Sequence, residues 1–142
     1  MNKQKSLPIQ WTSSLATEIF MIDDQHKELF RRIDRLMDAL TEGISNEELL
    51  ELFSFLEVYT LLHFNAEEEY MTEYNYPMTE LHKTQHVYFV DKLEELKEQA
   101  KNSFNSHQLA DLLKTHLIDW LINHIVKMDQ HLAAYLKKNR VS

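Results

Sequence analysis

Five of the eight histidines in this chain stand with two carboxylates at spacings that four antiparallel helices would bring together. Imidazoles and carboxylates are metal ligands, and burying them in an apolar bundle is costly unless an opposite charge compensates them. The candidate ligands are His26, His63, Glu67, His82, His86, His124 and Asp129. Seven ligands are too many for one metal ion and enough for two.

Two pairs of these residues, His63 with Glu67 and His82 with His86, are separated by four positions. On a helix this spacing places two donor side chains on one face, with Cβ atoms about 5–6 Å apart. That separation suits two ligands of one metal ion, or one ligand and one bridge. A single pair of this kind is weak evidence, since a helix face often carries such residues without a metal.

Heights along an antiparallel bundle supply the stronger argument, because residues equidistant from a turn lie at similar levels. The expected turns are centred near residues 44, 76–77 and 104. Reflection through the first turn places His26 at residue 62, beside His63, and reflection through the second places Glu67 opposite His86. Reflection of His82 and His86 through the third turn places them on either side of His124. Six of the seven groups therefore meet within two to three turns.

Asp129 does not follow from this geometry. It stands five residues after His124, and five residues rotate a side chain by about 140° relative to the first position in a regular α-helix. Spacing alone leaves this residue without support.

Helical periodicity predicts the elements that would position these side chains. One glycine and two prolines are few for a chain of 142 residues, which favours long uninterrupted helices. Asp23 is a suitable N-cap, Ser45 to Glu48 forms a capping-box pattern, and Pro77 ends a helix. We expect an extended N-terminal arm over 1–22 and helices at about 23–42, 46–74, 78–100 and 107–138. One domain, 1–142, would then be an all-α, antiparallel up-down-up-down four-helix bundle.

Composition narrows the class of partner and compartment. The net charge is −8, which argues against nucleic acid or an anionic membrane as partner. The chain has no cysteine, so it offers neither disulfides nor thiolate ligands. We find no signal peptide and no apolar run long enough to span a bilayer, and therefore expect a cytoplasmic protein.

The ligand types narrow the metal and its chemistry. An all-nitrogen and oxygen set with five imidazoles suits iron, zinc or manganese and excludes iron–sulfur clusters. If Glu67 and Asp129 bridge two ions, three histidines remain for one ion and two for the other, which leaves the second ion open to a small ligand. Neutral imidazoles stabilise high-valent iron less than carboxylates do. A histidine-rich di-iron site thus favours reversible O2 binding over oxidation of substrates.

The segments IDDQHKELF, HFNAEEEYM, NYP, HKTQH and WLINHIVKMD resemble the hemerythrin family, specifically its single-domain bacterial members, from Trp11 to about Tyr135. The resemblance implies a non-heme di-iron centre. His82, His86 and His124 would hold one iron, and His26 and His63 the other. Glu67 and Asp129 would bridge them together with an oxo or hydroxo group. Phe30, Leu62 and Trp120 are candidates for an apolar wall that excludes water.

We therefore expect reversible O2 binding for carriage, storage or delivery, without enzymatic activity. The alternatives are a sensor that responds to O2 or NO, an iron-handling protein on the same site, and an oxidase or peroxidase. In bacterial members of the family a glycine usually stands where this chain has Glu18, so a positive φ there would strain the arm. Glu68, Glu69 and Glu73 are expected to form a solvated acidic helix end.

Overall fold

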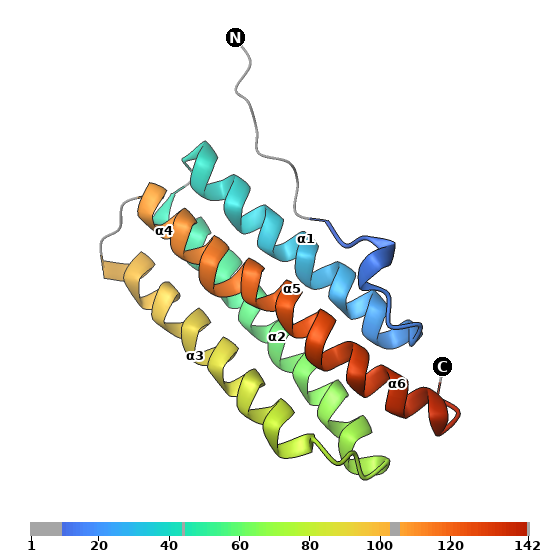
Figure 1. Cartoon of the computed structure of the whole chain (residues 1–142). Helices are drawn as coiled ribbons and strands as arrows, with labels where there is room; N and C mark the ends of the chain where they lie inside the picture. Colours follow the sequence, from blue (N-terminus) through green and yellow to red (C-terminus); the bar gives the residue numbers. More distant parts are fainter. Residues whose placement is uncertain (1–9, 44, 103–105, 142) are drawn as a thin grey trace.

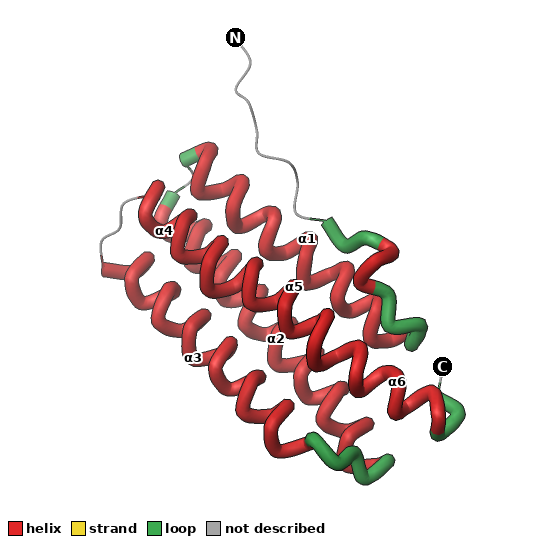
Figure 2. The backbone as a smooth tube through the Cα atoms, viewed as in Figure 1, coloured by secondary structure: helices red, strands yellow, loops and turns green. Residues whose placement is uncertain are grey.

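The computed structural model describes residues 10–43, 45–102 and 106–141. Four long helical segments, called rods below, lie side by side in a bundle (Figure 1). The first three rods are α1 (Phe20–Glu42), α2 (Asn46–Glu73) and α3 (Thr79–Asn102). The fourth contains α4 (Ser106–Leu113), α5 (Trp120–His124) and α6 (Gln130–Lys138). Only helices and loops occur in the part of the chain that Figure 2 colours. The fold confirms the predicted all-α bundle, with antiparallel neighbours joined by short connections.

The fourth rod is not the single regular helix expected over 107–138. Two π-helical segments, Lys114–Asp119 and Ile125–Asp129, join α4 to α5 and α5 to α6. Backbone angles stay helical through the junctions, for example φ −62° and ψ −44° at His124. The rod therefore continues unbroken but contains two wide turns, a feature that is frequent at functional sites.

The first helix begins earlier than predicted, and the arm before it is not extended throughout. The helix starts at Phe20, not at Asp23, and residues Ser13–Leu15 form a 3-10 turn. The Asp23 carboxylate instead accepts hydrogen bonds from the backbone N–H and the hydroxyl of Thr17, both at 2.8 Å, and from the backbone N–H of Glu18 at 3.1 Å. Asp23 thus fixes the arm onto the helix that follows it. Positions 1–9 of the predicted arm lie outside the described residues.

Glu18 has a positive φ of 70°, the conformation in which the sequence raised a question. A side chain other than glycine costs roughly 1–2 kcal/mol there. The hydrogen bond to Asp23 holds the backbone in place, and Lys137 Nζ lies 2.5 Å from the Glu18 carboxylate. Because that ion pair is exposed, it offsets little of the strain. The folded core stabilises a conformation that glutamate does not prefer.

Two apolar clusters fill the bundle, one on either side of a polar layer. The larger cluster contains the buried leucine and phenylalanine side chains of α1 to α5, including Leu29, Phe64 and Phe89. The smaller one joins the arm and α6 through Ile19, Ile22, Met71, Tyr76, Leu132, Ala133 and Leu136. Along α1 the order is Ile22, then His26, then Leu29, so the histidine lies between the clusters. Within the described ranges, no helix is long and apolar enough to cross a membrane.

Candidate metal centre

The polar layer contains all seven side chains that the sequence singled out. His26 comes from α1, His63 and Glu67 from α2, His82 and His86 from α3, and His124 and Asp129 from the fourth rod. Each is at most 3% exposed. They form two groups in which the ligand atoms lie within 4.8 Å of one another. The remaining histidines, His107, His116 and His131, belong to neither group.

Asp129 reaches this layer because the helix widens between it and His124. The five residues Ile125–Asp129 are π-helical, and a π-turn closes with a hydrogen bond between residues five apart. A step of five residues then returns the side chain to the same side of the rod, where a regular α-helix would rotate it away. The Nε2 atom of His124 and the nearer carboxylate oxygen of Asp129 are 3.1 Å apart.

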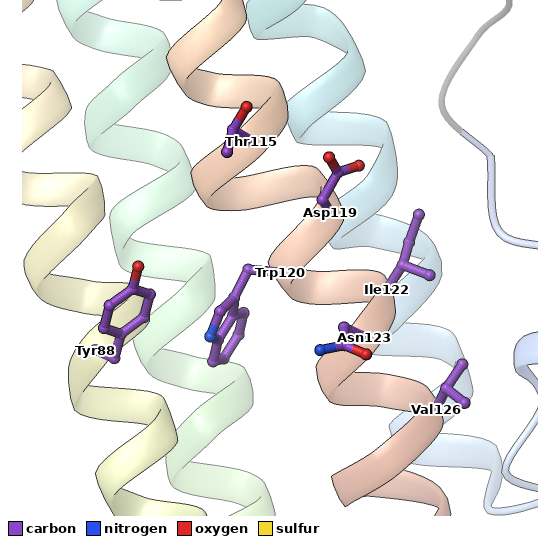
Figure 3. Close-up of a pocket in the computed structure, with 7 residues that line it drawn as sticks. All are labelled: Tyr88, Thr115, Asp119, Trp120, Ile122, Asn123 and Val126. Carbon is purple, nitrogen blue, oxygen red and sulfur yellow. The ribbon is translucent and has the colours of Figure 1, made fainter.

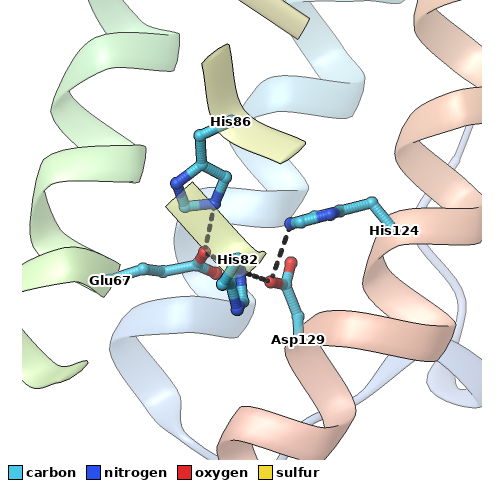
Figure 4. A group of neighbouring side chains, drawn as sticks. All are labelled: Glu67, His82, His86, His124 and Asp129. Carbon is cyan, nitrogen blue, oxygen red and sulfur yellow. Dashed lines mark hydrogen bonds and ion pairs between the residues drawn. The ribbon is translucent and has the colours of Figure 1, made fainter. Parts of the chain in front are cut away.

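The first group contains three imidazoles and one oxygen from each carboxylate (Figure 4). Asp129 Oδ1 lies 3.0 Å from Nε2 of His82 and 3.1 Å from Nε2 of His124. Glu67 Oε1 lies 3.1 Å from Nε2 of His86 and 3.3 Å from Nε2 of His82. All three rings therefore present Nε2 to the same small volume.

The second group contains two imidazoles and the opposite oxygen of each carboxylate. Asp129 Oδ2 lies 2.9 Å from Nε2 of His26, and Glu67 Oε2 lies 3.2 Å from Nε2 of His63 and 3.6 Å from Nε2 of His26. Each carboxylate thus divides its two oxygen atoms between a three-histidine group and a two-histidine group. This is the arrangement of two carboxylates that bridge neighbouring cations.

Unpaired atoms are concentrated in this cluster. Among the described residues, twelve buried side-chain nitrogen or oxygen atoms lack a hydrogen-bond partner, and ten of them belong to the cluster. Such groups are rare in folded proteins because burying them unpaired costs about 1–3 kcal/mol each. Within each group, nitrogen and oxygen atoms approach one another to about 3 Å, mostly without hydrogen-bond geometry, and converge on one point. The donor set of each group fits a metal ion.

Electrostatics show why a cation suits the layer. Burial alone would raise the pKa of Glu67 and Asp129, but the surrounding imidazoles hold both well below their usual range. Burial lowers the pKa of His26 and His82, yet their short contacts with the two carboxylates outweigh it and raise the pKa of each to about 9. The two buried anions therefore require positive charge. Protonated imidazoles supply this positive charge when only the side chains are present. Divalent cations would supply it in place of those protons.

Two residues outside the ligand set orient the rings. Gln25 Oε1 accepts a hydrogen bond from Nδ1 of His63, and Glu68 Oε2 accepts one from Nδ1 of His86, each at 2.8 Å. A proton on Nδ1 leaves the Nε2 lone pair free for a metal ion. The sequence had suggested that Glu68 belongs to a solvated acidic helix end, and that prediction is wrong.

The sequence carried a signal for both orienting residues that was not used. Reflection through the first turn places Gln25 opposite residue 63, and reflection through the second places Glu68 opposite residue 85, beside His86. The height argument that paired the ligands would also have paired them with their hydrogen-bond partners. What it could not show was which side chain faces the back of each ring.

Aromatic side chains enclose the cluster. The ring of Phe64 stacks on His86 with centroids 3.7 Å apart, and Trp120 stacks on His124 at 4.6 Å. Trp120 also lines a surface depression of about 560 Å³, together with Tyr88 (Figure 3). Phe30 is buried as expected, whereas Leu62 is 49% exposed, so its assignment to the wall was wrong. The helical period had placed Leu62 beside His63 without showing that it points outward.

Comparisons with known proteins agree with this centre. Residues 17–136 match the family model of the hemerythrin HHE cation binding domain. A bacteriohemerythrin of Pseudomonas aeruginosa is 34% identical over 81% of this chain and 72% of its own, and one of Stenotrophomonas maltophilia is 33% identical over 89% and 80%. A solved wild-type hemerythrin structure superposes with a TM-score of 0.79 at 27% identity, covering 92% of this chain and 98% of that one. The resemblance seen in the sequence is confirmed, and the chain belongs to the hemerythrin family.

Proposed function

We propose that this chain holds two non-heme iron ions and binds O2 reversibly for carriage, storage or delivery. The observation that carries the proposal is the division of the Glu67 and Asp129 oxygens between two groups of imidazoles. His82, His86 and His124 would hold one ion, and His26 and His63 the other. The second ion would have one protein ligand fewer and so accept a small external ligand. Two ferrous ions held there would supply the two electrons that O2 binding requires.

Iron is favoured over other metals by the donor set and by the family. Five imidazoles and two carboxylates suit iron, zinc or manganese, while the absence of cysteine from the sequence excludes thiolate sites. The hemerythrins are non-heme iron proteins, and the family model describes a cation binding domain. We infer a binding protein and not an enzyme, since neutral imidazoles dominate the ligand set and stabilise oxidised iron less than carboxylates do.

The surrounding residues have three tasks in this function. Gln25 and Glu68 fix the orientation of two imidazole rings, so less order has to be imposed when metal binds. Phe64 covers the ring of His86 with apolar surface, and Trp120 covers the ring of His124. Buried apolar clusters on both sides of the layer exclude water, which would otherwise compete with O2 and promote irreversible oxidation.

The test is to purify the chain, count metals, and record visible spectra through cycles of reduction, O2 exposure and O2 removal. We expect two irons per chain and a visible band that appears with O2 and disappears when O2 is removed. One metal per chain, or zinc in place of iron, would contradict the proposal.

The same preparation separates the alternatives. Iron handling predicts loss of iron to a mild chelator within the time of the O2 cycles, whereas a resident centre buried to at most 3% exposure should retain it. A sensor that responds to O2 or NO predicts that the ligand changes binding to another protein, which is measured separately from the spectrum.

A further inference from the structure

Thr60 is buried on α2 without a hydrogen-bond partner for its hydroxyl. The side chain is 0% exposed. Outside the metal cluster, the only other such buried atom among the described residues is the indole nitrogen of Trp11. An unpaired buried hydroxyl destabilises a folded protein, so its presence requires a physical reason.

Two other helical threonines of this chain show a bond that the hydroxyl of Thr60 does not make. Thr41 donates to the backbone oxygen of Met37 at 3.1 Å, and Thr84 donates to that of Glu80 at 3.0 Å. Both make the usual bond to the carbonyl four residues earlier, although both are exposed and could bond water instead. Thr60 has no water-exposed surface and still does not make this bond. Its hydroxyl is therefore directed elsewhere.

The helical period places Thr60 one turn away from a ligand of the metal centre. His63 follows Thr60 by three positions and Phe64 follows it by four, so all three side chains lie on neighbouring parts of one helix face. His63 belongs to the two-histidine group, and Phe64 belongs to the larger apolar cluster. Thr60 thus places one buried hydroxyl one helical turn before His63, a member of the group that has fewer protein ligands.

We propose that the Thr60 hydroxyl is the hydrogen-bond donor for the small molecule that binds at the two-histidine group, a diatomic gas or a small linear anion. The proposal rests on the function proposed above and names a residue that decides which ligands that site prefers. In an apolar pocket a single donor favours ligands that accept a hydrogen bond, because the surrounding side chains offer no alternative. The hydroxyl lacks a protein partner because the ligand is its partner.

Thr60→Val provides the test, since valine keeps the branched shape and replaces the hydroxyl with a methyl group. Thr60→Ser keeps the hydroxyl, and Thr41→Val removes an exposed hydroxyl remote from the centre. Each variant is loaded with iron, its metal is counted, and the affinity of the oxidised form for azide is measured by titration in visible light. The unfolding of each metal-free variant by urea is measured in parallel.

We expect Thr60→Val to retain two irons and to bind azide about fivefold more weakly, the loss that one hydrogen bond of ordinary strength predicts. Thr60→Ser and Thr41→Val should stay within twofold of the original chain. Metal-free Thr60→Val should be at least as stable as the original, because the unpaired hydroxyl is gone.

Two results would overturn the proposal. Unchanged azide affinity in an iron-loaded Thr60→Val variant would show that the hydroxyl does not reach the ligand. A marked loss of stability in the metal-free variant would show that the hydroxyl already has a partner within the protein. If the original chain fails to bind two irons, the proposed function fails, and this inference fails with it; failure of Thr60→Val alone leaves the function standing.

Discussion

The imidazole rings of His63 and His86 are held from behind by Gln25 and Glu68. Each ring therefore faces the interior with Nε2 before any metal arrives. A carboxylate behind an imidazole also makes the ring a better electron donor, an effect that a neutral amide produces less strongly. The two rings belong to different groups, so the two proposed iron ions have different supporting partners.

Glu68 offers a prediction with a matched control in the next residue. Replacing Glu68 with Ala should weaken metal affinity by roughly 10-fold to 100-fold, because His86 loses its hydrogen bond and its fixed orientation. Glu69 is exposed, and Glu69→Ala should leave the affinity unchanged. Competition with a chelator of known affinity measures both variants. Equal affinities for the two variants would show that the contact with His86 does not support the site.

At the scale of elements, the fourth rod explains a spacing that regular helices do not. The other helical ligand pairs stand four residues apart, and their helix, α2 or α3, is regular. His124 and Asp129 stand five apart, and the rod between them is π-helical. The extra residue is accommodated by widening the helix, so the carboxylate still meets the histidine.

This interpretation predicts different results for two single-residue deletions at exposed positions. Removing Val126 leaves a step of four residues between His124 and Asp129, which a regular α-helix satisfies, so two irons per chain should be retained. Removing Thr84 shortens the step between His82 and His86 to three residues and rotates the rest of α3 by about 100°. That variant should lose at least half of its iron. Iron content and melting temperature are the measurements, and equal losses would contradict the role of the π-turn.

For the whole molecule, the polar layer separates two apolar clusters that would otherwise form one core. Two buried carboxylates and five imidazoles replace apolar side chains in the half of the bundle nearer the α2–α3 connection, and ten of their atoms have no hydrogen-bond partner. The protein therefore gives up stability in this layer when only its own side chains are present. Cations that bind the folded state alone would restore it.

Removal of iron should lower the melting temperature. A ligand present at a hundredfold excess over its dissociation constant stabilises the folded state by about 2.7 kcal/mol. For a chain of this length that corresponds to roughly 10 °C. Thermal unfolding followed by circular dichroism, with and without anaerobic ferrous iron, measures the shift. A chain that binds two irons without a rise in melting temperature would show that iron does not bind the folded state alone.

The sequence by itself determined the four helices and the meeting of six side chains, because helical period and antiparallel reflection are local rules that act along the chain. His26, for instance, could be placed beside His63 from the position of one turn. It did not determine Asp129, the inward face of Glu68 or the outward face of Leu62. Those depend on a local widening of the fourth rod and on the rotation of each helix about its own axis. Packing against neighbouring helices sets the widening and the rotation, because the apolar and polar side chains of each rod must contact side chains of the same kind across the bundle.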